Sequence, residues 1–110
     1  MDLSTRYLGL ELAHPFMAGA SPLTDHIDSV LRLQDAGASA IVLNSLFEED
    51  IACHGAVAER YLEHVLRIKQ QTALPVIASL NGTTAEGWLQ YARLLERAGV
   101  DALELNFYFI

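Results

Sequence analysis

Small polar residues follow apolar stretches at three places along the chain. Asn44 and Ser45 follow one apolar run, Ser79 and Asn81 close a second, and Asn106 closes a third. In parallel α/β folds, function lies where the strands end. An amide has two donors and an acceptor, and an Asn that closes a buried strand needs a partner. The pattern predicts a site that binds a ligand through uncharged hydrogen-bonding groups, with Asn106 as its strongest candidate.

Simpler interpretations exist for the other polar residues. Asn44 and Ser45 can cap the following helix, a role that is compatible with ligand binding. Ser79 and Asn81 can instead serve the turn that leads to Thr83.

A phrase that occurs twice predicts the elements that position these residues. The pattern occurs in residues 36–43 and again in residues 98–105: an amphipathic stretch ends, a glycine follows, and a short apolar run begins. Gly37 and Gly99 suit the left-handed position that closes a helix. A repeated helix–glycine–strand unit is typical of an α/β fold with a parallel sheet.

The remaining elements follow from periodicity and capping residues. A hairpin is expected over about 6–14, and four strands over 15–22, 40–44, 75–80 and 101–106. Three helices lie between them: the first has Thr24 as its N-cap and Asp25 in its first turn, the second carries the stripe Tyr61, Leu62, Val65 and Ile68, and the third begins with a capping box of Thr83 and Glu86.

This order allows an open doubly wound sheet or a (β/α)₈ barrel. No Gly-x-Gly-x-x-Gly motif follows a strand, so a Rossmann dinucleotide site has no support. A complete barrel takes about 250 residues. We therefore expect residues 1–110 to form a single partial domain, the N-terminal half of a TIM barrel or a truncated product.

Composition limits the partners and the location. Seven Lys and Arg against fourteen Asp and Glu give a net charge of −7, which argues against non-specific nucleic-acid binding. No apolar run is long enough to span a membrane, and the N-terminus does not resemble a secretory signal. One cysteine fits a reducing cytoplasm. Cys53-His54 and His64 match no common zinc spacing, and Glu48-Glu49-Asp50 favours a helix N-terminus more than a cation site.

Several segments together resemble the dihydroorotate dehydrogenase-like proteins. They occur in order over nearly the whole chain: residues 1–10, 15–23, 46–49, 75–82 (Pro-Val-Ile-Ala-Ser-Leu-Asn-Gly) and 102–106 (Ala-Leu-Glu-Leu-Asn). The resemblance implies an FMN-dependent oxidoreductase on a TIM barrel. In that family the flavin lies across the carboxyl ends of the strands, and dihydroorotate is oxidised to orotate in pyrimidine biosynthesis.

The resemblance also assigns site residues by position. The cofactor-binding residues it implies are Ala18, Gly19, Ala20, Ser21, Asn44, Ser45, Ser79, Asn81 and Asn106, and Asn106 is implied to contact the substrate as well. Small side chains at 18–21 allow the backbone to approach a flat ring. No metal is implied.

Three departures concern the substrate chemistry. Asn44 stands where family enzymes commonly have a lysine, and Phe109 stands where the soluble enzymes have a Cys or Ser base. The stretch between Glu49 and Tyr61 is shorter than in the family. The catalytic base is therefore absent or lies beyond residue 110, and the substrate is dihydroorotate or a related molecule.

The family's usual phosphate-binding loops come after the seventh and eighth strands. We therefore expect residues 1–110 alone to bind FMN weakly or not at all. A second hypothesis is a non-catalytic fragment that self-associates through its open sheet edges, giving a homo-oligomer. A third, a flavin-free lyase or aldolase, needs a Schiff-base lysine on a strand, whereas Lys69, the only lysine, falls on a predicted helix.

Overall fold

The computed structural model describes residues 1–53 and 55–107. An antiparallel hairpin of β1 (Thr5–Tyr7) and β2 (Leu10–Leu12) comes first, as predicted. Leu8 and Gly9 form its turn with φ values of 52° and 77°. Two positive φ values in a two-residue turn match the twist of the flanking strands.

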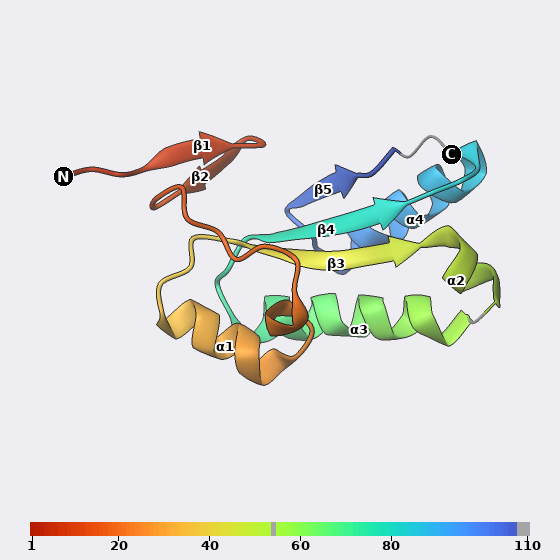
Figure 1. The fold of residues 1–110 in the computed structure, drawn as a ribbon, viewed down its shortest axis with the longest axis horizontal. Coiled ribbons are helices and arrows are strands. Elements are labelled where there is room, and N and C mark those ends of the chain that lie inside the picture. Colours follow the sequence, from red (N-terminus) through yellow and green to blue (C-terminus); the bar gives the residue numbers. More distant parts are fainter. Residues whose placement is uncertain (54, 108–110) are drawn as a thin grey trace.

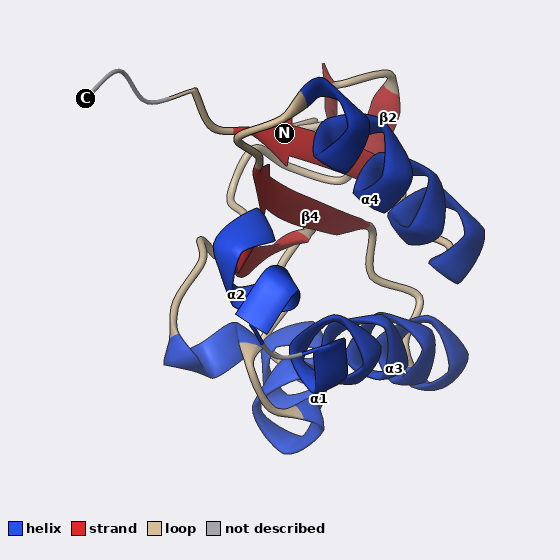
Figure 2. Cartoon of the chain, turned by 90° about the vertical axis from the view of Figure 1, so that its right-hand side faces the viewer, coloured by secondary structure: helices blue, strands red, loops and turns tan. Residues whose placement is uncertain are grey.

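A three-stranded parallel sheet forms the body of the chain. It contains β3 (Ile41–Phe47), β4 (Val76–Asn81) and β5 (Ala102–Leu105), side by side in that order. Helix α3 (Gly55–Gln71) connects β3 to β4, and α4 (Ala85–Ala98) connects β4 to β5. Figures 1 and 2 show the sheet with α3 and α4 packed beside it. The α/β class with a parallel sheet, predicted from the sequence, is confirmed.

The helices pack on one face of this sheet. One cluster joins Ile41 and Leu43 to the preceding helix α1 (Ile27–Asp35) and to α3. A second joins Leu46 and Leu80 to α3 and α4, with Trp88 and Tyr91 at its border. Because side chains alternate along a strand, the residues between these apolar ones face the opposite side of the sheet.

The glycines predicted to end helices do so. Gly37 and Gly99 have φ values of 91° and 98°, and Gly99 caps α4 in the left-handed conformation. The helices therefore end where the repeated pattern predicted, and the strands that follow begin within one residue of their predicted starts.

Several local predictions are wrong. The segment 15–22 forms only an isolated bridge from Ala18 to Ile41, so the parallel sheet has three described strands rather than four. Thr24 is buried in a short 3₁₀ helix, η1 (Pro22–Thr24), which Ser21 caps, and α1 starts later, after His26.

Two further corrections concern the segments that follow β3 and β4. An additional helix, α2 (Glu48–Cys53), lies between β3 and α3, so four α-helices rather than three are present in the described chain. Thr84, not Thr83, caps α4, because its side chain accepts a hydrogen bond from the backbone N–H of Gly87.

Candidate functional site

A row of polar side chains crosses all three parallel strands on the face that the helices leave uncovered. Ser45 of β3 pairs with Ser79 of β4, which pairs with Glu104 of β5. Ser45 Oγ lies 2.8 Å from Ser79 Oγ, and Ser79 Oγ lies 2.8 Å from Glu104 Oε1. The register of the parallel strands thus brings together residues that lie up to 59 positions apart in the sequence, as Ser45 and Glu104 do.

Asn106 completes this row from just beyond β5. Its Nδ2 donates to Ser79 Oγ at 2.8 Å and to Ser45 Oγ at 3.2 Å. A serine hydroxyl has one proton, and that of Ser79 goes to the Glu104 carboxylate, so Ser45 donates to Ser79. The amide nitrogen of Asn106 is therefore committed to the serines, and its oxygen stays available as an acceptor.

A β-bulge turns Ser45 toward this face. Ser45 lies three positions after Val42 in β3, whereas its partner Ser79 lies only two positions after Ile77 in β4. Without the extra residue, Ser45 would share the helix-covered face with Leu43. The bulge is the reason that the three strands present a continuous polar row.

Tyr61 of α3 holds the bulge open. Its hydroxyl donates to the carbonyl oxygen of Asn44 at 2.8 Å and accepts from the backbone N–H of Ser79 at 3.3 Å. These are the backbone groups that the bulge removes from the ladder. Burial raises the pKa of Tyr61 to about 12, so the hydroxyl keeps its proton and remains a donor.

Asn81 lies two residues beyond Ser79 and so on the same face of β4. Leu80 pairs with Leu105, which places Asn81 level with Asn106. Asn81 is 6% exposed, and its Oδ1 is buried without a hydrogen-bond partner among the described residues. A buried amide oxygen with no partner is uncommon and calls for an explanation.

Asn44 does not join this group. The expectation that Asn44 and Ser45 end their strand is wrong, because β3 continues to Phe47. Asn44 Nδ2 donates to Asp25 Oδ1 at 2.6 Å, and at 3.4 Å to the carbonyl oxygen of Ser21. Asn44 thus fastens the segment before α1 to β3 within the chain itself.

The small residues 18–21 run beside β3. Ala18 exchanges backbone hydrogen bonds with β3, from its N–H to Ala40 and from the N–H of Val42 to its carbonyl oxygen. Gly19 and Ala20 are exposed, and a Cβ on Gly19 would meet nothing within 4 Å. Gly19 does not have a positive φ, and no neighbouring atom of the described chain would clash with a side chain there. The space around position 19, beside β3, is therefore open.

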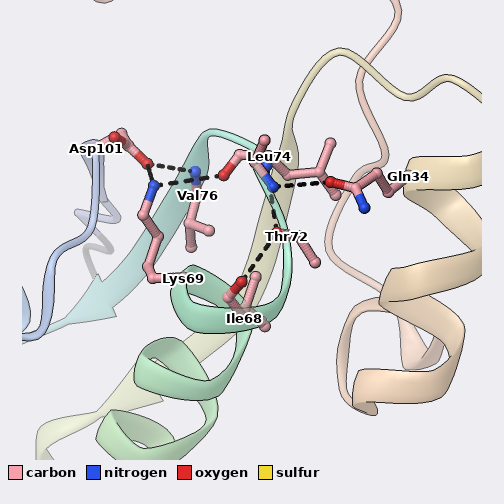
Figure 3. A network of polar contacts seen from close by, with 8 residues as sticks. Gln34, Ile68, Lys69, Thr72, Leu74, Val76 and Asp101 are labelled. Carbon is pink, nitrogen blue, oxygen red and sulfur yellow. Dashed lines mark hydrogen bonds and ion pairs between the residues drawn. The ribbon is translucent and has the colours of Figure 1, made fainter.

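Charges at the two ends of the sheet differ. At the end where the strands begin, Lys69 Nζ lies 2.7 Å from Asp101 Oδ2, which also accepts from the backbone N–H of Val76 (Figure 3). At the end where they finish, no Lys or Arg of the described chain contacts the polar row. Lys69 lies on α3, as predicted, and far along the strands from Ser79 and Asn106.

A second carboxylate, that of Glu48 at the start of α2, binds the segment that precedes α4. Glu48 accepts hydrogen bonds from the backbone and side chains of Thr83 and Thr84, at the N-terminus of α4. These donors, chiefly the Thr84 hydroxyl, lower its pKa to about 2. The acidic segment does serve a helix N-terminus, but that of α4, not only that of the helix it begins.

Glu104, Tyr61, Asp25 and Glu48 were not predicted as site residues. Of these, Glu104 carried a readable signal, because it precedes Asn106 by two positions on a strand. His64 binds the carbonyl oxygen of Thr24 through Nε2 at 2.7 Å, a packing role. His54 and Phe109, and the side chain of Cys53, lie outside the described residues.

Two searches of the described chain concern other kinds of site. No three His, Cys, Asp or Glu side chains gather as metal ligands within residues 1–53 and 55–107. No helix in these ranges is long and apolar enough to cross a membrane.

The sequence is similar to several curated oxidoreductases. It is 28% identical over 123 residues to the catalytic subunit of dihydroorotate dehydrogenase B (NAD(+)) of Thermoplasma acidophilum, covering 96% of this chain and 41% of that protein. It is 28% identical over 131 residues to the NAD-dependent dihydropyrimidine dehydrogenase subunit PreA of Escherichia coli K12, covering 96% and 32%. Identity to the dihydroorotate dehydrogenase B subunit of Thermoplasma volcanium is 27%, covering 96% and 41%.

The chain thus spans less than half the length of each of these relatives. The alignments are longer than the chain, so the relatives carry extra residues between matched segments. No family model matches the chain. Over nearly all of its residues, the chain is nevertheless similar to part of a dihydroorotate dehydrogenase catalytic subunit and part of a dihydropyrimidine dehydrogenase subunit, in agreement with the resemblance seen in the sequence.

Proposed function

We propose that this chain supplies the first strands of a TIM-barrel oxidoreductase that uses FMN to oxidise a carbon–carbon single bond in a small cyclic substrate such as dihydroorotate. The consecutive strand order, with helices on one face, supports a barrel because a doubly wound sheet reverses its order. The similarity to two dehydrogenases that act on reduced pyrimidines supports the chemistry.

The observation that carries the proposal is the convergence of Ser45, Ser79 and Asn106. These three were expected to bind the cofactor, and they hydrogen-bond to one another on one face of the sheet. The open space beside Gly19 and the free oxygen of Asn106 fit the edge of a planar ring that carries both N–H and C=O groups.

In this proposal the flavin, when bound, accepts hydride from the substrate carbon. The chain itself positions and orients. Asn106 offers its oxygen to flavin and substrate while the two serines fix its rotamer. Residues 18–21 let the ring approach the backbone closely. Asn44, bonded to Asp25 and Ser21, shapes the neighbouring segment and reaches the ring only if those bonds open. The base that would take the substrate's proton is absent or lies beyond residue 110.

A flavin titration tests the proposal. The purified chain is titrated with FMN and with riboflavin, and quenching of flavin fluorescence is followed. We expect weak, saturable binding, with dissociation constants between about 10 µM and about 1 mM, and similar values for both flavins, because the ring contacts are here and the phosphate contacts are not. Asn106→Leu abolishes it.

A matched control is Gln70→Leu, on the exposed side of α3, which leaves binding unchanged. Equal flavin binding by wild type and Asn106→Leu would overturn the proposal.

Self-association remains a second proposal, and exposed apolar side chains favour it. Leu89 is 60% exposed beside a groove between α4 and β5, and Leu105 on β5 is 44% exposed. β5 has no strand on its outer side in the described chain. Size-exclusion chromatography with light scattering tests this: a dimer at micromolar concentration supports it, and a monomer contradicts it.

A further inference from the structure

Glu104 of β5 bonds to the centre of the polar row although it is itself exposed to solvent. Ser79, to which it bonds, is only 1% exposed. Three polar atoms surround Ser79 Oγ, each at 2.8 Å: Glu104 Oε1, Ser45 Oγ and Asn106 Nδ2. A hydroxyl has one proton and two acceptor sites, so three partners use its whole hydrogen-bonding capacity. Each partner therefore limits what the other two can do.

The carboxylate of Glu104 fixes the direction of these bonds. A carboxylate accepts hydrogen bonds and donates none, so the Ser79 proton points to Glu104 and both acceptor sites of Ser79 Oγ receive protons from elsewhere. One of these protons comes from Asn106 Nδ2, which also donates to Ser45 Oγ at 3.2 Å. The bond to the carboxylate is charge-assisted and therefore stronger than a bond between two neutral groups. It takes precedence in ordering the row.

The same count of protons excludes the reversed amide. If Asn106 turned its oxygen toward the serines, the single proton of Ser79 would face two acceptors, Glu104 Oε1 and Asn106 Oδ1. One contact would then join two oxygens with no proton between them, because the amide atom in this position lies 2.8 Å from Ser79 Oγ. Without the carboxylate, both serine hydroxyls are free to donate to the amide oxygen, and the amide can reverse. Glu104 thus selects which end of the amide faces away from the serines.

We propose that Glu104 is a positioning residue, which orients the Asn106 amide so that its oxygen, and not its NH₂ group, is presented to a ligand. Asn106 is half-buried and lies with the serines on the face that the helices leave uncovered. A ligand group that meets this oxygen must be a hydrogen-bond donor. That consequence for binding rests on the proposed function. The orientation itself is a property of the free chain and is measured without a ligand.

NMR of the Asn106 side-chain amide tests the orientation on the full 110-residue chain. The signal is identified by its loss in Asn106→Leu, and the exchange of its protons with water is measured. We expect slow exchange in the wild type, because the nitrogen donates to both serines. Glu104→Met keeps an unbranched side chain but removes the acceptor. We expect it to accelerate the exchange about tenfold, as the NH₂ group leaves the serines.

Two further variants separate positioning from structural support. Glu104→Gln keeps an acceptor oxygen within reach of the Ser79 hydroxyl and should return the exchange to near the wild-type rate. Glu63→Met replaces an exposed glutamate of α3 and should leave the exchange unchanged. The backbone N–H of Ser79, which donates to Tyr61, should keep its protection from exchange in every variant. Loss of that protection in Glu104→Met would show a merely structural role and overturn the proposal.

Equal exchange of the Asn106 amide in wild type and Glu104→Met would also overturn the proposal, as would exchange in Glu104→Gln as fast as in Glu104→Met. Riboflavin titrations of the same variants test the proposed function separately, and we expect Glu104→Met to weaken binding about fivefold. If the amide signal responds as expected but riboflavin binds equally to wild type and Glu104→Met, the positioning role stands and the flavin contact of Asn106 fails. If Asn106→Leu abolishes riboflavin binding but Glu104→Met leaves the amide signal unchanged, the positioning role fails alone.

Discussion

Replacing Tyr61 by Phe tests whether one hydroxyl holds the bulge that forms the site. The substitution removes a bond of 2.8 Å to the Asn44 carbonyl and one of 3.3 Å from the Ser79 N–H. Each buried group left unsatisfied costs about 1–3 kcal/mol, with the longer bond at the low end. We expect the free energy of unfolding to fall by about 2–4 kcal/mol, a large fraction of the stability of a small domain.

Urea denaturation followed by far-ultraviolet circular dichroism measures the loss. The matched control is Tyr91→Phe, which removes a hydroxyl that bonds nothing in the described chain and should cost under about 0.5 kcal/mol. Hydrogen exchange supplies a local readout, because the Ser79 amide should lose protection in Tyr61→Phe before the rest of β4 does. A loss no larger than that of the control, with Ser79 still protected, would show that the bulge forms without Tyr61.

Three further substitutions test neighbouring contacts. Glu48→Gln should destabilise the chain at pH 7. The folded-state pKa of Glu48 is lowered from 4.5 to about 2, so the stability that its carboxylate contributes is complete above about pH 4.5 and is lost as the pH falls through 2. The melting temperatures of variant and wild type should therefore converge between these pH values. Gly82→Ala should lower the free energy of unfolding by about 1–3 kcal/mol, because a Cβ there would lie 2.6 Å from the Trp88 ring. Gly19→Ala is the control: open space surrounds that position, so its urea midpoint should equal that of the wild type. Equal midpoints for the two variants would refute the packing argument. Lys69→Met should cost about 1 kcal/mol, because its ion pair with Asp101 is partly exposed, and a difference from wild type that persists in 1 M salt would contradict an ionic origin.

The helix ends and the polar row show what local pattern can predict. Gly37 and Gly99 mark helix ends because few other residues adopt a left-handed conformation without strain. Asn106 marks the end of a strand because it follows an apolar run, and it lies just beyond β5. In these cases one residue's own chemistry decides the structure, so the sequence suffices.

The bulge in β3 shows what local pattern misses. Alternation of side chains alone would place Ser45 on the same face as Leu43, and no residue near Leu43 in the sequence indicates a β-bulge. The register is decided by Tyr61, which is sixteen positions further along and on another element. The same holds for Glu48, which selects Thr83 and Thr84 as partners across 35 and 36 positions. Such contacts depend on the assembled fold.

The two ends of the parallel sheet divide stability from binding. Where the strands begin, the polar groups satisfy one another: Gln34 accepts from the N–H of Ala73, and Lys69 and Asp101 pair while Asp101 also holds Val76 (Figure 3). Where they finish, the described chain offers no partner to the buried oxygen of Asn81, and the Asn106 oxygen accepts no hydrogen bond from it. A chain selected only for stability would replace Asn81 with an apolar residue, because its unpaired oxygen weakens the free protein. We therefore expect Asn81→Leu to raise the unfolding midpoint; a midpoint equal to or below that of the wild type would show that the unpaired oxygen does not weaken the free chain.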